Sequence, residues 1–273
     1  MTNNIFLPEK FQIVEDKNDP YSLELSFEPC APGYGLTIGN ALRRILLSSL
    51  VGGAVFAIKI KGVKHEFDTI DGIKEDAIEI ILNIKKLILK IHTDDVVILE
   101  LKKKGKGDVL ASDIKINADV DIINSDLKIA TIIDENAEID IKFWVRNGIG
   151  FYPTENRKEK IDEVGAISID ANFNPIILAN FRVEKTRVGD IVDLDKVILT
   201  VKTNGSIGPR KAIRDSLNIL INNLELIREN VNEKDDKESI TKNKVAKEKP
   251  KKEKEAKKKP VTKKTTTAKK SKK

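Results

Sequence analysis

The chain has 273 residues, of which 40% are hydrophobic and 34% are charged. This length allows one large domain or two ordinary ones, with a sizeable core. The single cysteine, Cys30, excludes an intramolecular disulfide and a zinc site built from several cysteines. The N-terminus lacks the basic and apolar regions of a signal peptide, and no apolar run approaches the ~20 residues that a membrane span needs. We therefore expect a soluble, intracellular protein.

The charge of the chain is unevenly placed. Residues 233–273 hold 18 lysines against seven acidic residues, a net charge of +11. Because the whole chain carries +6, residues 1–232 carry −5. The basic tail also has two prolines and few apolar residues, so it cannot bury enough surface to offset the entropy of ordering. We predict that this tail is disordered and that any contact with nucleic acid concerns the tail alone.

Three segments show helical periodicity, with apolar residues three or four positions apart. The first covers residues 37–50, and the second follows the turn at Asp71-Gly72 and reaches Ile88. The third begins at Gly208-Pro209, where proline suits the first turn of a helix. The apolar positions are Ile38, Ala41, Leu42, Ile45 and Leu46 in the first, Ile73, Ala77, Ile80, Ile81, Ile84 and Ile88 in the second, and Ile213, Leu217, Leu220, Leu224 and Ile227 in the third.

Other segments alternate with period two or are rich in β-branched residues, which predicts strands. In chain order they are residues 55–60, 96–101, 114–123, 139–145, 166–169, 180–186 and 197–202. Asn204-Gly205 closes the last of them with a turn signal. Strands outnumber helices and the two do not alternate strictly, so the pattern predicts an α+β fold.

A glycine-rich segment, Gly33-Tyr-Gly35-Leu-Thr-Ile-Gly39, opens the first helix and raises the possibility of a nucleotide-binding enzyme. Its third glycine is one position late for a dinucleotide fingerprint, and the preceding residues 28–32 are broken by proline and form no parallel strand. A tight turn into a helix is the better interpretation.

Candidate metal ligands are sparse. His65, followed by Glu66, and His92 have no HExxH partner, so we interpret them as surface or pocket-filling residues. Two carboxylate pairs lie two positions apart in predicted strands, which puts each pair on one face and makes a metal conceivable, although solvated strand faces are commoner. These pairs are Asp119 with Asp121 and Glu138 with Asp140. We expect a protein that binds rather than catalyses.

One stretch carries a specific resemblance: EPCAPGYGLTIGNALRRILLSSL, residues 28–50. It resembles the first helix region of bacterial-type RNA polymerase alpha subunits, with a Gly-aromatic-Gly turn followed by a GNALRR…LLSS helix. Further matching stretches follow in the order of the family, so that the resemblance covers about residues 8–230. They are residues 62–67 (GVKHEF), 75–85 (EDAIEIILNIK), 148–153 (GIGFYP), 169–175 (IDANFNP) and 193–199 (DLDKVIL).

The resemblance implies a two-part architecture. A dimerisation domain of a sheet and two long helices would comprise residues 1–51 and 178–232, and a β-rich domain of residues 52–177 would be inserted into it. The alpha subunit forms a homodimer that scaffolds the catalytic beta and beta-prime subunits of this nucleotidyltransferase, so no catalytic residue is expected here. The implied dimer interface comprises Ile38, Leu42, Ile45, Leu46, Leu50, Leu217, Leu220, Leu224 and Ile227.

Three residues match family positions at the large subunits. Arg44 matches the position that contacts beta, where a guanidinium fork suits a specific contact. Lys85 and Ile169 match positions that approach beta-prime, although the family commonly has valine in place of Ile169. The resemblance implies no cofactor in this chain, because the Mg²⁺ of the complex belongs to beta-prime, and it implies a cytoplasmic, nucleoid-associated protein, or a stromal one in a plastid.

The C-terminus departs from the family pattern. The usual helical DNA-binding domain has no counterpart after Val231, and the +11 tail stands in its place. The tail contacts upstream DNA without reading sequence, or it is only a solubilising extension, and the sequence leaves both possibilities open. A free-standing nucleic-acid-binding protein that acts through the tail is the alternative function, and the acidic body argues against it.

Overall fold

The computed structural model describes residues 7–156 and 163–248, and it describes side chains as far as Val231. The chain divides into two units, residues 1–220 and residues 221–273. Strands dominate the first unit, together with the helices α1, α2 and the beginning of α3. The predicted α+β class is therefore confirmed.

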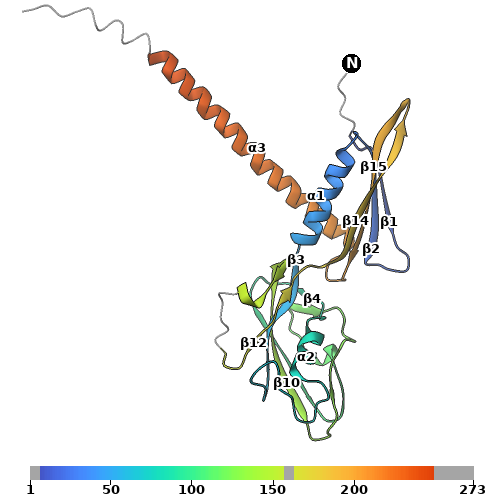
Figure 1. Cartoon of the computed structure of the whole chain (residues 1–273), viewed down its shortest axis with the longest axis vertical. Helices are drawn as coiled ribbons and strands as arrows, with labels where there is room; N and C mark the ends of the chain where they lie inside the picture. Colours follow the sequence, from blue (N-terminus) through green and yellow to red (C-terminus); the bar gives the residue numbers. More distant parts are fainter. Residues whose placement is uncertain (1–6, 157–162, 249–273) are drawn as a thin grey trace, which may run out of the picture. The chain divides into compact units, whose positions relative to one another are not determined.

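One sheet joins strands from both ends of the first unit (Figure 1). It is antiparallel and has the order β1-β2-β15-β14, formed by Lys10–Glu15, Ser22–Cys30, Ile191–Thr203 and Ile176–Val188. We call it sheet A. Val197, Leu199 and Val201 of β15 lie on one face and are buried, as expected for the face of a sheet that packs on the core. Ile198 between them is buried as well.

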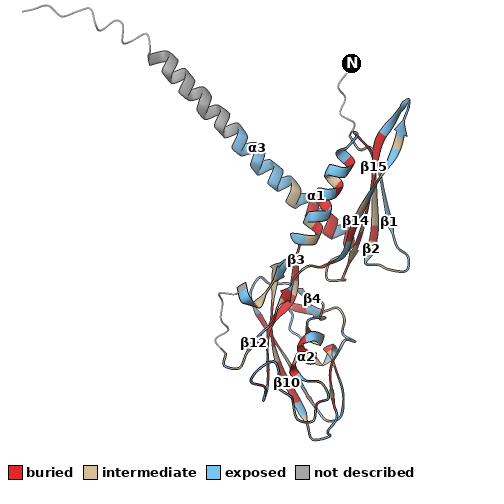
Figure 2. Cartoon of the chain, viewed as in Figure 1, coloured by how far each residue is buried: buried red, intermediate tan, exposed pale blue. Residues whose placement is uncertain are grey.

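Helix α1 (Tyr34–Ser48) packs closely on β14 and β15 because two of its residues have no side chain. A Cβ at Gly39 would overlap the ring of Phe181, and a Cβ at Gly35 would lie 3.0 Å from both Asp195 and Val197. The interface encloses a core that appears red in Figure 2. This core comprises Leu23, Leu42, Leu46, Leu50, Ile176, Ala179, Leu199, Val201, Ala212 and Ile213.

Asp195 fixes the beginning of α1. Its side chain is buried, and its Oδ2 accepts hydrogen bonds from the amides of Gly33 (2.8 Å) and Gly35 (3.3 Å), while Lys185 Nζ lies 3.1 Å from Oδ1. Burial alone would raise the pKa of Asp195, but these donors outweigh it and hold the pKa below its usual value. The negative carboxylate also matches the positive end of the helix dipole.

A second, larger sheet lies in the middle of the sequence, and we call it sheet B. Its strands have the order β7-β5-β10-β3-β4-β8, and β12 pairs with β3. In chain order they are β3 (Val51–Ile60), β4 (Leu89–Ile91), β5 (Val97–Lys104), β7 (Ile114–Lys115), β8 (Val120–Ile122), β10 (Glu138–Ile149) and β12 (Ile167–Ser168).

Short elements complete this part of the chain. The buried face of α2 (Ala77–Ile84) belongs to the same hydrophobic cluster as Ile58, Leu101 and Phe143 of sheet B. Two small antiparallel sheets pair β6 (Gly107–Leu110) with β9 (Lys128–Ile132), and β11 (Phe151–Tyr152) with β13 (Ala171–Asn172). The 3₁₀ turn η1 (Ala111–Asp113) follows β6, and the 3₁₀ turn η2 (Thr154–Asn156) follows β11.

Two predicted elements differ from the structure. The segment 114–123 is not one strand but two, β7 and β8, because Asn117 and Asp119 form a side-chain-supported turn between them. The second helix ends at Ile84 rather than Ile88, because Asn124 draws the amide of Ile88 into a hydrogen bond of 2.9 Å. The boundaries of the domains predicted above stay predictions.

Helix α3 (Pro209–Glu248) is longer than predicted. Its backbone continues through residues 233–248, where the sequence between 210 and 249 contains neither glycine nor proline, and Pro250 disfavours helix in the residue before it. The disorder predicted for the tail from residue 233 stays a prediction. The rest of the predicted tail, 249–273, lies outside the described residues. Among the helices that the structure describes, none is long and apolar enough to span a membrane.

Candidate subunit interfaces

The residues predicted for a dimer interface fall into two groups in the structure. Leu42, Leu46 and Leu50 are buried in the core under α1, so their side chains are already satisfied within one chain. Ile38, Ile45 and Leu220 are half-buried. In contrast, Leu217, Leu224 and Ile227 are 37%, 57% and 61% exposed. The structure therefore leaves mainly the α3 residues available to a second chain.

Further apolar residues of α3 are exposed within the single chain. Ile221 (49%) and Val231 (56%) continue the side of the helix that bears Leu217 and Leu224, and Leu226 (58%) lies on the opposite side by helical periodicity. The sequence analysis missed Leu226 and Val231. A helix that exposes apolar residues on more than one side requires a partner surface to remain stable in water.

Strand β1 adds apolar surface that the periodicity did not reveal. Phe11 and Ile13 lie opposite Phe27 and Leu25 of β2, so they belong to the face of sheet A that Ile38 of α1 contacts. Phe11 is nevertheless 67% exposed and Ile13 is 44% exposed. The apolar face of sheet A thus extends beyond the area that α1 covers.

The two arginines of α1 have different environments. Arg43 Nε donates a hydrogen bond of 3.2 Å to the carbonyl of Ala179 on β14. Arg44 is exposed, and within the described residues its guanidinium has no hydrogen-bond or ion-pair partner. Of this pair, Arg44 is the one that is free to contact another protein.

Lys85 and Ile169 are the two residues predicted for a second contact. Asp170, which follows Ile169 in the sequence, pairs with Lys85. Lys85 Nζ lies 3.2 Å from Asp170 Oδ2, while Asp170 Oδ1 accepts hydrogen bonds from Thr154 Oγ1 (2.7 Å) and Thr154 N (2.9 Å). These bonds lower the pKa of Asp170 to about 2, and the bond from the Thr154 hydroxyl contributes most. Ile169 itself is only 3% exposed.

The cluster has an open side toward solvent. Lys85 and Asp170 line a small hollow of about 90 Å³ together with Phe151, which is 63% exposed. Ile169 contributes to the core below, and its amide donates to the carbonyl of Phe56. Lys85 therefore supplies the positive charge at this surface, and Ile169 packs in the core below it. Sequence reasoning missed Asp170, whose only signal was its place beside Ile169.

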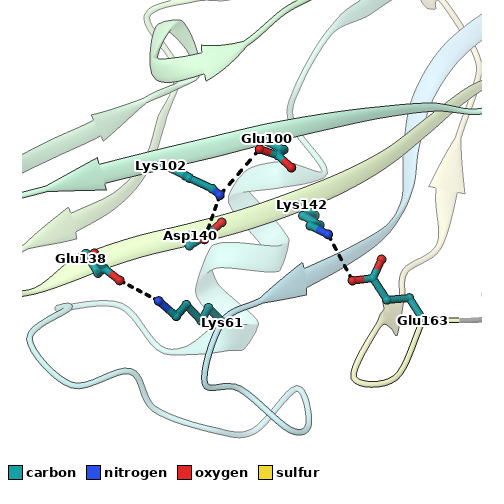
Figure 3. Close-up of polar contacts among 7 residues, drawn as sticks. All are labelled: Lys61, Glu100, Lys102, Glu138, Asp140, Lys142 and Glu163. Carbon is teal, nitrogen blue, oxygen red and sulfur yellow. Dashed lines mark hydrogen bonds and ion pairs between the residues drawn. The ribbon is translucent and has the colours of Figure 1, made fainter.

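Three of the four candidate carboxylates are engaged in ion pairs, whereas Asp119 accepts a hydrogen bond of 3.1 Å from Asn117 Nδ2. Asp121 lies 2.9 Å from His92 Nε2. Glu138 pairs with Lys61 at 2.8 Å, and Asp140 pairs with Lys102 at 3.4 Å (Figure 3). Within the described part of the chain, no three His, Cys, Asp or Glu side chains form a group that could hold a metal ion.

The remaining candidates have structural environments as well. His65 lies 3.1 Å from Asp68 at the surface, and the neighbouring Glu66 is exposed. The amides of Gly33 and Gly35, which a nucleotide phosphate would need, are already bonded to Asp195. Gly33 has the positive φ of 83° that a tight turn requires.

Comparison with known proteins first defines the class of the central part. Residues 58–174 match the family model described as the RNA polymerase Rpb3/RpoA insert domain. This range contains α2 and most of sheet B.

Longer matches then define the family. The DNA-directed RNA polymerase subunit alpha of Carboxydothermus hydrogenoformans is 44% identical over 220 residues, which is 81% of this chain and 69% of the relative. The subunit of Aquifex aeolicus is 44% identical over 235 residues (86% and 73%), and that of Bifidobacterium longum is 38% identical over 225 residues (82% and 68%). The chain belongs to the family of DNA-directed RNA polymerase alpha subunits.

The low pKa of Asp170 predicts a pH-dependent contribution to stability. Because the folded pKa is about 2, below the ordinary 3.8, the contribution is fully present above pH ~4 and is lost as the pH falls toward 2. Asp170→Asn should lower the free energy of unfolding by about 1 kcal/mol at neutral pH, less than the full shift implies, because the side chain is 38% exposed and screened.

Urea unfolding of both proteins between pH 7 and pH 3 measures this difference. The difference should shrink below pH ~4. Asp126→Asn, at an exposed aspartate, is the control. A wild-type advantage that stays constant down to pH 3 would contradict the prediction.

Proposed function

We propose that this chain is a non-catalytic assembly subunit of a DNA-directed RNA polymerase. It pairs with a second copy of itself, and the pair recruits the beta and beta-prime subunits. The observation that carries the proposal is the exposed apolar surface of α3, in a chain whose family assembles into a multisubunit enzyme. As a part of that enzyme, the chain acts in the cytoplasm or in a plastid stroma.

The exposed residues support pairing with a second copy. Leu217, Leu224 and Ile227 of α3, and Phe11 of β1, are apolar and accessible in one chain. A two-fold dimer pairs equivalent surfaces of the two copies, so that each of these apolar surfaces is covered by its counterpart. An obligate interface of this kind buries more than about 2,000 Å². Leu42, Leu46 and Leu50 contribute indirectly, because they position α1 from its buried side.

Two polar sites support contacts with the large subunits. Arg44 is free to hold a carboxylate or backbone oxygens of beta in a fork geometry. Lys85, held by Asp170, is the proposed contact for beta-prime, with Ile169 supporting the surface from below. These roles follow the family positions that Arg44, Lys85 and Ile169 match.

The chemistry of nucleotide addition is proposed to belong to other subunits. In each carboxylate pair that could be a candidate for Mg²⁺, at least one member is engaged with a lysine or histidine side chain. A carboxylate that already bears a close ammonium partner is a poor ligand for a dication, because the two cations repel each other. The Mg²⁺ of the complex is expected in beta-prime.

The basic tail is proposed to contact upstream DNA through its phosphates. Its +11 charge allows counterion release without base recognition. Such binding is weak alone, on the order of 10⁻⁴ to 10⁻⁶ M at physiological salt, but tethering to a polymerase on DNA raises its effective concentration.

The first prediction concerns pairing of the chains. Leu224→Glu puts a charge into the proposed apolar interface and should raise the dimer dissociation constant at least about 100-fold. Light scattering over a range of protein concentrations measures it. Asn222→Glu, the same new side chain on the other side of α3, should leave the dimer intact. A monomeric wild type that ignores beta and binds DNA alone would favour the free-standing nucleic-acid-binding function instead.

The second prediction concerns beta. Arg44→Ala should weaken capture of beta about tenfold or more, because a charged hydrogen-bonding group is lost from the interface, while the mass of the dimer stays unchanged. Arg214→Ala removes an exposed arginine from α3 as the matched control. Pull-down titration of beta with the full chain measures the effect, and equal capture by both variants would rule out this role for Arg44.

The third prediction concerns the tail. Deleting residues 240–273 should lower promoter occupancy of the assembled polymerase at low salt and reduce the salt dependence of occupancy. A variant whose tail lysines are replaced by glutamine separates charge from length. If occupancy at low salt is the same with and without the tail, the DNA-binding role is excluded.

A further inference from the structure

The solvent face of sheet B is an ordered array of charges. Charged residues alternate with buried apolar ones along β5 and in the first half of β10, and Lys59 lies near the end of the otherwise apolar β3. Most charges on this face have an opposite charge beside them, as Figure 3 shows for Lys61 with Glu138 and for Lys102 with Glu100 and Asp140. Cross-strand pairs of opposite charge stabilise an antiparallel sheet.

Lys59 and Lys142 form one pair of like charges within this pattern, although Glu100 of β5 is the other cross-strand neighbour of Lys142. They lie directly opposite each other on β3 and β10, and both side chains are half-buried. Two like charges in this position destabilise a sheet unless an anion lies between them. The sheet therefore contains a built two-lysine site for an anion, which we call the lysine clamp.

Glu163 fills the lysine clamp. One oxygen, Oε1, lies 3.0 Å from Lys59 Nζ and 3.3 Å from Lys142 Nζ. Figure 3 shows Glu163 reaching Lys142 from the loop rather than from the sheet. The hydrogen bond from Lys59, supported by that from Lys142, lowers the pKa of Glu163. The occupant is thus a peptide carboxylate supplied by the chain itself.

The clamp opens into a hollow of about 390 Å³. Four lysines and two carboxylates line it, since Lys61 and Lys64 join the clamp residues while Asp140 and Glu163 oppose them. Asp140 is engaged by Lys102 of β5 and Lys61 by Glu138, so the hollow's remaining charges are Lys59, Lys64 and Lys142 against the single carboxylate of Glu163. At the rim Val164 is 92% exposed, beside a turn in which Gly165 has a φ of 82°.

We propose that this hollow is a binding site for an acidic peptide segment of another protein, and that Glu163 is an internal competitor for it. The partner's carboxylate takes the place of Glu163 between Lys59 and Lys142. A peptide is favoured over nucleic acid because the resident ligand is itself the peptide Glu163-Val-Gly165.

Competition from Glu163 limits which ligands can bind at the hollow. A tethered carboxylate has an effective concentration in the millimolar range, so a single free carboxylate cannot displace it. A segment with several acidic residues can, because another of its carboxylates reaches Lys64 at the same time. Partners with one acidic residue are therefore excluded, and acidic clusters are selected.

The test uses the full chain and a fluorescently labelled hexapeptide, Glu-Glu-Val-Gly-Glu-Glu, with binding followed by anisotropy. Glu163→Gln removes the competitor and should tighten binding about tenfold. Glu135→Gln removes an exposed acidic residue elsewhere and should change affinity less than about twofold. The basic tail binds the probe equally in both variants, so the difference between them reports the hollow.

A second pair of variants locates the effect. In the Glu163→Gln background, Lys142→Gln should abolish the gain, whereas Lys106→Gln, at an exposed lysine, should not. Equal affinities of Glu163→Gln and Glu135→Gln would overturn the proposal. Displacement of the peptide by pyrophosphate at equal concentration would also overturn it, because the hollow would then recognise charge rather than a peptide. Neither readout requires the other polymerase subunits, so the result does not depend on the proposed assembly role.

Discussion

The buried carboxylate of Asp195 is the constraint on which sheet A and its helix depend. It lies on β15, yet it bonds the amides of Gly33 and Gly35 and so fixes the beginning of α1. A buried charge is costly unless it is fully paired, and here two amides and Lys185 satisfy it. With the helix start fixed, Gly39 lies against the ring of Phe181. The direction of α1 across the sheet follows from these contacts.

This close packing decides which apolar residues remain for other chains. The sequence correctly indicated the apolar stripe of α1, because period 3.6 is visible in any single segment. It could not show that Leu42 and Leu46 face the chain's own core while Leu224 and Ile227 are exposed. That distinction depends on whether a helix face is covered by other parts of the chain, as α1 is by β14 and β15, and this is a tertiary property. The apolar residues of β1 were missed for the same reason.

Other parts of the fold show where local patterns lose information. The central strands were predicted because they are long and alternate clearly. Short strands such as β11 and β13 were not, because two residues carry no periodicity. The carboxylate pair Glu138 and Asp140 was found from spacing alone, but its partners come from elsewhere, Lys61 from the turn after β3 and Lys102 from β5. Ion pairing across a sheet depends on register, and no single segment encodes it.

The stretches that identify the family act on one another in space. The 193–199 stretch supplies Asp195, which holds the glycine turn of the 28–50 stretch. The 169–175 stretch supplies Asp170, which holds Lys85 at the end of the 75–85 stretch. In both cases an aspartate from a later segment orients an element from an earlier one, on a surface proposed for assembly. A carboxylate suits this task because it accepts several directed hydrogen bonds at once, so each contact surface is positioned before any partner arrives and less ordering entropy opposes binding.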